Sequence, residues 1–450
     1  MAELIDVSLR KRLLASIAGD SLVLLCGAGL SMAPPTRLPS AWQIAQDCAA
    51  KYRVITGFDL PGDLANNIER LAEHFHDSKE LQNVFLGQLI NWAEFVRGPT
   101  NKGHTTIADF LGARFVALAI STNVDTLIET AASQLGEPDF YPTVFKEDVN
   151  RVQNSHVPLL KLHGCAVKSR WDTVWCKNQL NDEPLQTRIQ QLAAWMQGYL
   201  PNRDLLVVGF WSDWAYLNEI LEGAIVSTEP RSVILVDPDT DEALERKSPK
   251  MWNWATNHAN FVHIGVSGAD FLDELRSVVS CHFIRKVWEE GCRSFTVMAK
   301  RAPPADPCPA LTAYSTDDLY RLRRDLTGVS TSSIVRQKDV NNQHALIGLI
   351  HLALLASGAT LSSNTFQWNG STIRVIHTPN EPLSAIANRF SREPPDPSPP
   401  TRNVCAGAFD DGGAPANIIQ RGVPQGIIRN VPNSQWETHQ NLLTELQRAL

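Results

Sequence analysis

The sequence predicts an α/β protein: a Rossmann-like, doubly wound, mostly parallel sheet with a helical insertion, followed by a smaller C-terminal α+β region. Three observations support this prediction. Short apolar runs, typical of strands buried on both faces, alternate with helical patterns. The first run, Leu22–Cys26, leads directly into the glycine turn Gly27-Ala28-Gly29. Later runs end in small or polar residues, at the strand ends where open parallel sheets bind ligands.

The composition is that of a globular chain with room for two domains. It has 450 residues, 43% of them hydrophobic, which is enough to form a full core. The formal net charge is −7, so the basic excess that is typical of nucleic-acid binding is missing. The N-terminus lacks a signal-peptide core, and the longest apolar stretch, 345–361, is shorter than the ~20 residues of a membrane span. We therefore expect a cytoplasmic protein without membrane contact.

The predicted elements of the first 288 residues alternate as in an α/β fold. A helix at Val7–Ala18 precedes the first strand. Apolar residues at three- and four-residue spacing then predict an insertion of helices at 41–50, 63–74 and 79–96. Further helices are expected at 104–111, 126–135 and 216–226, and further strands at 115–121, 158–162, 205–208, 232–236 and 261–264.

Composition divides the chain into a first domain at 1–288, an α+β region at 289–392, and a proline-rich linker and tail at 393–450. In the second region we expect helices at 317–326 and 344–356, a hairpin at 366–377 that turns at Asn369-Gly370, and a segment at 385–390 that closes a small α+β unit. The run 393–402 is expected to be an extended linker. The tail places four apolar residues on one helical face, which packs either on its own domain or on a partner: Trp436, Leu443, Leu446 and Leu450.

Four segments at the ends of successive predicted strands form one constellation. They are GAGLS at 27–31, TNVD at 122–125, KLHG at 161–164 and GFWSDW at 209–214. In this order they resemble the sirtuin family, whose members carry GAG-x-S, then T-x-N-x-D or T-N-x-D, then L-H-G. The joint occurrence is far more specific than any single motif, since the glycine turn alone is equally well explained as a tight connection without a ligand. The likeness covers roughly residues 1–285.

The resemblance implies an NAD site in the crevice above the strand ends. It assigns the pyrophosphate to Gly27, Ala28, Gly29 and Ser31, and the nicotinamide ribose and its surroundings to Thr122, Asn123 and Asp125. His163 would be the general base. The adenine-ribose side would be formed by Gly209, Ser212 and Asp237.

The chemistry of NAD cleavage requires the same residue types independently of the family. Nicotinamide leaves easily, so the enzyme must stabilise an oxocarbenium-like ribose and supply a nucleophile. An imidazole can accept a proton near neutral pH, and an amide can hold a water by donating and accepting at once. His163 and Asn123 suit these roles. The structural alternatives are a histidine that caps a strand end and an asparagine that caps the helix after it.

Two departures from the protein-deacylating sirtuins bear on the activity. Those enzymes follow the glycine turn with G-I-P-D-F-R and carry a zinc module of two C-x-x-C pairs after L-H-G. Here the turn is followed by Met32-Ala33-Pro34, and only Cys165 and Cys176 stand in the place of the zinc module. None of the eight cysteines forms a C-x-x-C pair, so we expect reduced thiols and no metal. Arg37 is a candidate phosphate ligand, although a solvated loop charge is the simpler explanation.

With GAGLSM at 27–32 followed by PSAW at 39–42, and with a chain of this length, the sequence instead resembles the sirtuin-like NAD hydrolases of bacterial antiphage defence. This resemblance implies an NAD⁺ glycohydrolase that releases nicotinamide and ADP-ribose, acts as a toxic effector in abortive infection, and stays inactive until triggered. We expect residues 289–450 to regulate the enzyme or to join it to a companion sensor protein or to further copies of itself. The alternatives are an NAD-dependent protein deacylase and a non-catalytic nucleotide-binding subunit.

Overall fold

The computed structural model describes residues 4–135, 142–143, 159–211, 229–303, 311–328, 339–378, 380–390, 399–410 and 435–450. The chain forms two compact units, Met1–Glu274 (unit 1) and Leu275–Leu450 (unit 2). Within the described residues, no helix is both long enough and apolar enough to cross a membrane.

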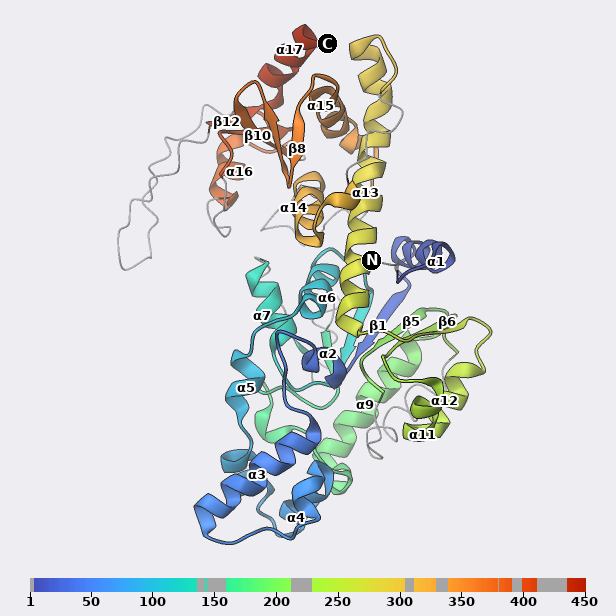
Figure 1. Ribbon diagram of the computed structural model, residues 1–450, viewed down its shortest axis with the longest axis vertical. Coiled ribbons are helices and arrows are strands. Elements are labelled where there is room, and N and C mark those ends of the chain that lie inside the picture. Colours follow the sequence, from blue (N-terminus) through green and yellow to red (C-terminus); the bar gives the residue numbers. More distant parts are fainter. Residues whose placement is uncertain are drawn as a thin grey trace, which may run out of the picture. The chain divides into compact units, whose positions relative to one another are not determined.

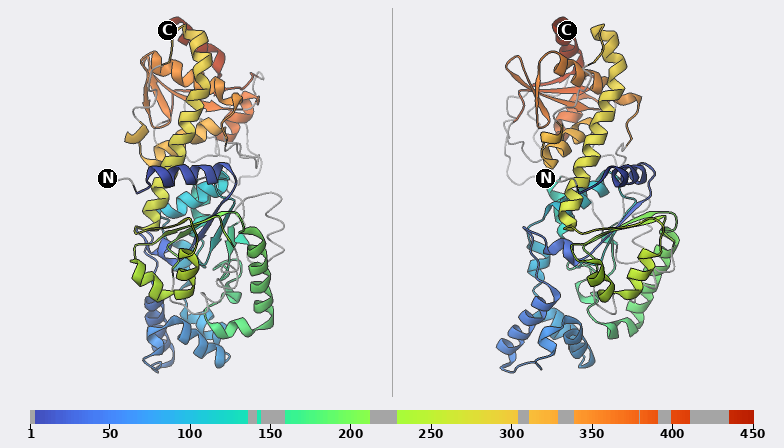
Figure 2. Two further views of the ribbon diagram at one scale, coloured as in Figure 1. Left: turned by 90° about the vertical axis from the view of Figure 1, so that its right-hand side faces the viewer. Right: turned by 45° about the vertical axis from the view of Figure 1, so that its right-hand side comes forward.

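Unit 1 is built on a seven-stranded sheet with the strand order β3-β4-β2-β1-β5-β6-β7, in which every neighbouring pair is parallel. Helices flank both faces of the sheet (Figures 1 and 2). From β1 the chain adds β2 on one side and later β5 on the other, so the direction of the connections changes between β1 and β5. The strands are β1 (Leu22–Cys26), β2 (Leu118–Ser121), β3 (Pro142–Thr143), β4 (Leu159–Lys161), β5 (Asp204–Val208), β6 (Ser232–Val236) and β7 (Phe261–Ile264).

The predicted doubly wound fold is thereby confirmed. All five residues of β1 are buried, and so are those of β5 and β6, which explains why these strands are continuous apolar runs. Residues of β1 alternate between the two faces: Val23 and Leu25 belong to a core cluster with residues of α9, α11 and α12. The short edge strand β3 was not predicted.

The helices of unit 1 agree with the predicted pattern in place and differ in length. The predicted helix at 79–96 is divided at Ile90-Asn91 into a π-helical segment and α5. The predicted helix at 216–226 lies outside the described residues. The helices are α1 (Val7–Ala18), α2 (Ala28–Met32), α3 (Ala41–Thr56), α4 (Ile68–Asp77), η2 (Leu81–Leu89), α5 (Trp92–Arg97), α6 (Lys102–Gly112), α7 (Leu127–Gln134), α9 (Glu183–Tyr199), α11 (Asp241–Lys247) and α12 (Pro249–Thr256).

The helical insertion is held by an aromatic cluster that includes the segment after the L-H-G motif. The Trp175 ring lies 5.7 Å from the Phe85 ring and 6.2 Å from the Trp92 ring, both edge-on. Trp175, Ala166 and Cys176 share one core cluster with the insertion helices. Apolar packing therefore anchors this segment.

Unit 2 contains a five-stranded mixed sheet with the order β12-β11-β10-β9-β8. The strands β8 (Thr360–Ser362), β9 (Thr365–Trp368) and β10 (Ser371–His377) are antiparallel. The predicted hairpin turn is confirmed, because Asn369 and Gly370 both have positive φ, as a two-residue type I′ turn requires. The helices are α13 (Gly268–Ala299), which crosses the division between the units, α14 (Thr316–Thr327), α15 (Ala345–Ala356), α16 (Leu383–Phe390) and α17 (His439–Ala449).

The segment predicted as linker and tail contributes two strands to this sheet. β11 (Arg402–Ala406) pairs parallel with β10, and β12 (Gln435–Thr438) pairs parallel with β11. Arg402, expected at the end of the linker, is therefore a strand residue, and residues 393–398 lie outside the described part of the chain. Parallel pairing joins residues about 30 positions apart, which a local pattern does not reveal.

The last helix packs within its own unit. Leu442 and Leu446 are buried in the unit 2 core, and Leu443 and Leu450 pack against it. Trp436, predicted on the same helical face, lies in β12 instead. Of the two possibilities left open by the sequence, the structure therefore shows the helix folded onto its own domain.

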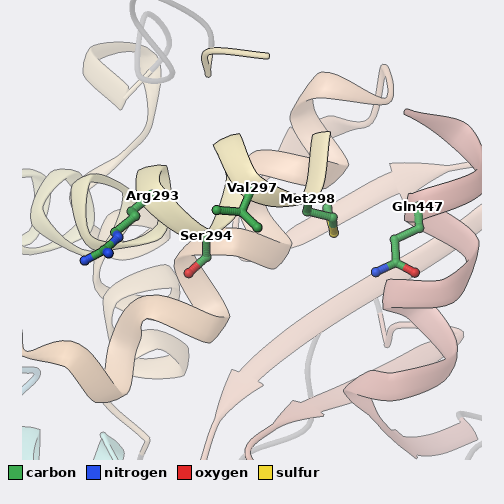
Figure 3. A pocket seen from close by; sticks show the side chains of 5 residues that line it. All are labelled: Arg293, Ser294, Val297, Met298 and Gln447. Carbon is green, nitrogen blue, oxygen red and sulfur yellow. The ribbon is translucent and has the colours of Figure 1, made fainter. Parts of the chain in front are cut away.

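A shallow hollow of about 640 Å³ lies in unit 2 between α13 and α17 (Figure 3). Its lining combines the apolar Val297 and Met298 with the polar Arg293, Ser294 and Gln447. None of these residues belongs to the predicted site.

Candidate functional site

The turns after β1 and β5 meet backbone to backbone where the sheet connections change direction. The Gly27 N–H donates to the Val208 carbonyl at 3.2 Å, and the Gly29 N–H donates to the Gly209 carbonyl at 2.8 Å. A Cβ added to Gly29 would lie 2.8 Å from the Gly209 oxygen, and Gly209 itself has φ +55°. Gly27, Gly29 and Gly209 are three of the predicted ligand residues. Each must be glycine because the two turns approach too closely for a Cβ. Ala28 follows as the first residue of α2.

The Ser31 hydroxyl joins three of the motifs in one hydrogen-bond network. It donates to Asp125 Oδ2 at 2.8 Å and accepts from Asn123 Nδ2 at 3.0 Å. His104 Nε2 lies 3.1 Å from the Ser31 hydroxyl oxygen. Since His104 Nδ1 accepts from the Asn101 N–H at 3.2 Å, the proton is assigned to Nε2, which donates to Ser31. One donated and two accepted bonds use the full capacity of this hydroxyl, so Ser31 orients its neighbours.

His104 is a site residue that the sequence did not single out. It is fully buried, and burial lowers its pKa, with nearby Asp125 acting in the opposite direction. Asn101 caps α6 through the N–H groups of Gly103 and His104, and its Nδ2 donates to the Leu30 carbonyl at 2.7 Å. The sequence signal that could have drawn attention to this segment is Asn101, a helix-capping residue type three positions before the apolar pattern of 104–111 begins.

Asn123 is oriented by the β1 turn. Its Nδ2 donates to Ser31 and, at 3.1 Å, to the Gly27 carbonyl, so both amide hydrogens are used. Asn123 does not cap α7, whose N-cap residue is Thr126, and Asp125 Oδ1 accepts from the Leu127 N–H at 3.1 Å at the start of this helix. Among the described contacts no donor reaches Asn123 Oδ1, which leaves this oxygen as an acceptor for a ligand.

His163 follows β4 and lies next to the β2 turn. It is 4% exposed, and its ring is hydrogen-bonded to the backbone of Thr122, the residue before Asn123. Burial, reinforced by the positive charge of Arg188 on α9, lowers the pKa of His163 to about 4, and the bond to Thr122 acts in the opposite direction. The imidazole is therefore uncharged at neutral pH. Arg188, itself buried, was not predicted from the sequence.

The other predicted site residues lie at the carboxyl ends of further strands or in loops away from them. Thr122 is buried and donates its N–H to the Cys26 carbonyl at 3.0 Å. Asp237 follows β6, and burial raises its pKa. Its Oδ1 accepts from the Asp239 N–H at 3.0 Å. Arg37 is exposed, as expected of a solvated loop charge. Ser212 lies outside the described residues.

The two cysteines after the L-H-G motif are free thiols in separate contacts. Cys165 lies beside Lys161, and Cys176 contacts Gln179. Burial raises the pKa of Cys176 to about 12, which keeps it a protonated thiol and disfavours metal binding. Across the ranges that the structure describes, no group of three or more His, Cys, Asp and Glu side chains could hold a metal ion.

A comparison with known protein families finds a similarity over part of unit 1. A family model described as a SIR2-like domain matches residues 117–264, which include the β2 turn and His163. This part of the chain is therefore similar to SIR2-like domains. No curated protein matches the sequence.

Two solved structures illustrate the structural similarity. A Sir2 homologue in complex with NAD is 16% identical, with a TM-score of 0.35 and coverage of 60% of this chain and 94% of its own. Sir2 in complex with an inhibitor, 2′-O-acetyl-ADP-ribose and a deacetylated p53 peptide is 14% identical, with a TM-score of 0.30 and coverage of 62% and 98%.

Substitution of Gly29 by alanine tests the contact between the turns. The new Cβ would meet the Gly209 backbone, so we expect Gly29→Ala to lower the free energy of unfolding by roughly 1–3 kcal/mol. The control Gly62→Ala adds its Cβ to open space and should stay within about 0.5 kcal/mol of the wild type. Urea unfolding measures both. Equal stability of Gly29→Ala and the wild type would contradict the described contact.

The protonation state of His163 can be measured by NMR. Its imidazole signals, assigned by their loss in His163→Gln, should titrate with a midpoint near 4 instead of the ordinary value of about 6.5. Arg188→Met removes a positive charge that opposes protonation, so it should move the midpoint upward. A midpoint near 6.5 in the wild type would contradict the buried, uncharged imidazole.

Proposed function

We propose that unit 1 is an NAD⁺ glycohydrolase that releases nicotinamide and ADP-ribose. One observation carries the proposal: the loops bearing Asn123 and His163 lie side by side at the edge of the sheet, next to the turns at Gly29 and Gly209. Parallel sheets bind their ligands at this position, where the connections change direction. The SIR2-like domain match and the NAD complex of a structurally similar Sir2 homologue add support for NAD as the substrate.

The two side chains have complementary properties for the cleavage. The uncharged imidazole of His163 can accept a proton from a water or a ribose hydroxyl. Asn123, with both amide hydrogens used, presents its partly negative oxygen, which can orient that water and stabilise positive charge developing on the ribose. Asp125 and Ser31 hold the amide in this orientation.

Water as the acceptor is favoured over an acyl-lysine peptide. In this chain the segment after His163 is anchored by Trp175 and the aromatic cluster of the insertion, and the sequence has no C-x-x-C pair that would supply a zinc module. The peptide groove that depends on such a module is therefore not expected. A non-catalytic nucleotide-binding subunit remains the alternative if NAD binds without cleavage.

Purified full-length protein mixed with NAD⁺ tests the activity. We expect nicotinamide release without any peptide, and no acceleration by an acetylated peptide. His163→Ala and Asn123→Ala should each lower the turnover rate at least about 100-fold, since each removes a group that acts on the reacting atoms. The control His74→Ala, an exposed histidine on α4, should keep wild-type turnover.

The outcomes separate the three functions. Release only with peptide would indicate a deacylase, and binding without release would indicate a nucleotide-binding subunit. Full turnover by the His163→Ala, Asn123→Ala double variant would overturn the proposed mechanism.

We further propose that the enzyme is a cytoplasmic effector of bacterial antiphage defence that acts by abortive infection. Hydrolysis of an abundant cofactor is toxic, so such an enzyme must stay inactive until triggered. Residues 289–450 are proposed to provide this regulation, or to join the enzyme to a companion sensor or to further copies. The separate core of unit 2, formed by α13, α14, α15, α17 and the second sheet, supports this proposal because it makes the unit compact in its own right.

Phage infection of cells that express the protein tests the effector role. Cells with the wild-type chain should lose NAD⁺ after infection and release fewer phage, whereas cells with His163→Ala should retain both NAD⁺ and susceptibility. NAD⁺ is measured by enzymatic cycling during infection with a panel of phages. Equal protection by the His163→Ala variant would contradict an effector that acts through NAD⁺ loss.

A further inference from the structure

Lys161 is a buried lysine at the base of the candidate site, two residues before His163. Its side chain is only 1% exposed. The Nζ atom donates to the Asp125 carbonyl oxygen, lies 2.7 Å from Glu129 Oε1 on α7, and is 3.9 Å from Cys165 Sγ. A lysine is almost never buried without compensating contacts, so this arrangement needs an explanation.

The Lys161 side chain is one of several hydrogen-bonded links between the end of β2 with its following turn and the end of β4 with its following segment. The others include two backbone bonds, from the Leu162 N–H to the Ser121 carbonyl at 3.0 Å and from the Ala166 N–H to the Val124 carbonyl at 2.8 Å, and the bond of the His163 ring to the Thr122 backbone. These links connect the loops that carry Asn123 and His163. Lys161 therefore contributes to their relative position.

Asp125 connects Lys161 to Asn123 by hydrogen bonds that pass through Ser31. Its carbonyl accepts from Lys161, its Oδ1 from Leu127 and its Oδ2 from Ser31. Ser31 in turn accepts from the Asn123 amide. A continuous chain of bonds thus runs from Lys161 through Asp125 and Ser31 to Asn123.

Glu129 compensates the charge of the lysine. Burial lowers the pKa of Lys161, but Glu129, Cys165 and Asp125 outweigh it, so the pKa is raised and the amine stays charged. Glu129 is 16% exposed, so the pair lies at the margin of the buried region. A charged donor makes a stronger bond to a carbonyl oxygen than a neutral one.

We infer that Lys161 is a positioning residue for the proposed NAD⁺ hydrolysis, which holds the Asn123 amide in register with His163 by fixing Asp125 through its backbone carbonyl. This inference rests on the proposed function. The competing explanation is that the Lys161–Glu129 pair only stabilises the packing of α7.

Four variants and one control separate the two explanations: Lys161→Met, Lys161→Arg, Glu129→Gln, the double variant Lys161→Met with Glu129→Gln, and the control Lys11→Met. Lys11 is an exposed lysine on α1. Misplacement of a reacting group by about 1 Å costs on the order of 100-fold in rate, so Lys161→Met should lower kcat by about 10- to 100-fold. KM should change less, because substrate contacts distant from the lysine remain. Lys161→Arg keeps a charged donor and should recover most of kcat.

The double variant provides the decisive comparison. It removes the uncompensated carboxylate, so its thermal midpoint should return toward that of the wild type. Its kcat should nevertheless stay as low as that of Lys161→Met, because the bond to Asp125 is missing. Recovery of kcat together with stability would overturn the positioning role and leave only a structural one. Glu129→Gln should lose less kcat than Lys161→Met, and a larger loss would also overturn the inference.

Hydrogen exchange measured by mass spectrometry gives a readout that does not need turnover. Peptides covering 122–130 should exchange faster in Lys161→Met than in the wild type, Lys161→Arg or Lys11→Met. Unchanged exchange would overturn the inference. If the wild type neither binds nor cleaves NAD⁺, the proposed function fails, whereas wild-type kcat in Lys161→Met defeats the positioning role alone.

Discussion

The direct contact between two backbone turns at the centre of the sheet is the constraint on which the candidate site depends. β1 and β5 are adjacent, and the Gly29 N–H donates to the Gly209 carbonyl at 2.8 Å just beyond their ends. No side chain fits between these turns, which requires glycine at both positions. The contact places Ser31, two residues further on, where it reaches both Asn123 and Asp125.

The hydrogen-bond network around Ser31 is satisfied by the chain itself. Ser31 uses its full hydrogen-bonding capacity, and the charge of Lys161 is compensated by Glu129. Such a network is rigid, because displacing one member would leave another buried and unpaired. His163 and Asn123 then contribute the two properties that the proposed chemistry needs, an uncharged imidazole and an oriented amide oxygen.

The predicted fold was correct where local patterns are strong and incomplete where pairing is distant. β1, β6 and β7 occupy the predicted residues, since buried parallel strands are short apolar runs with clear ends. β11 and β12 were missed in the segment predicted as linker and tail, because proline-rich neighbours obscured them and their partners lie far away in sequence. In the candidate site, the sequence singled out the motif residues, whereas His104 and Arg188 come from helices whose own patterns indicate only packing.

The sequence by itself determined the order of strands and glycine turns, and hence which residues stand at strand ends, because these features depend on local apolar patterns and backbone freedom. Only the tertiary structure decided how those ends are connected: the tautomer of His104, the orientation of the Asn123 amide and the bond from Lys161 to Asp125. Each of these depends on atoms brought together from different strands and helices. Hydrogen bonds require distances and directions that no spacing along one chain specifies.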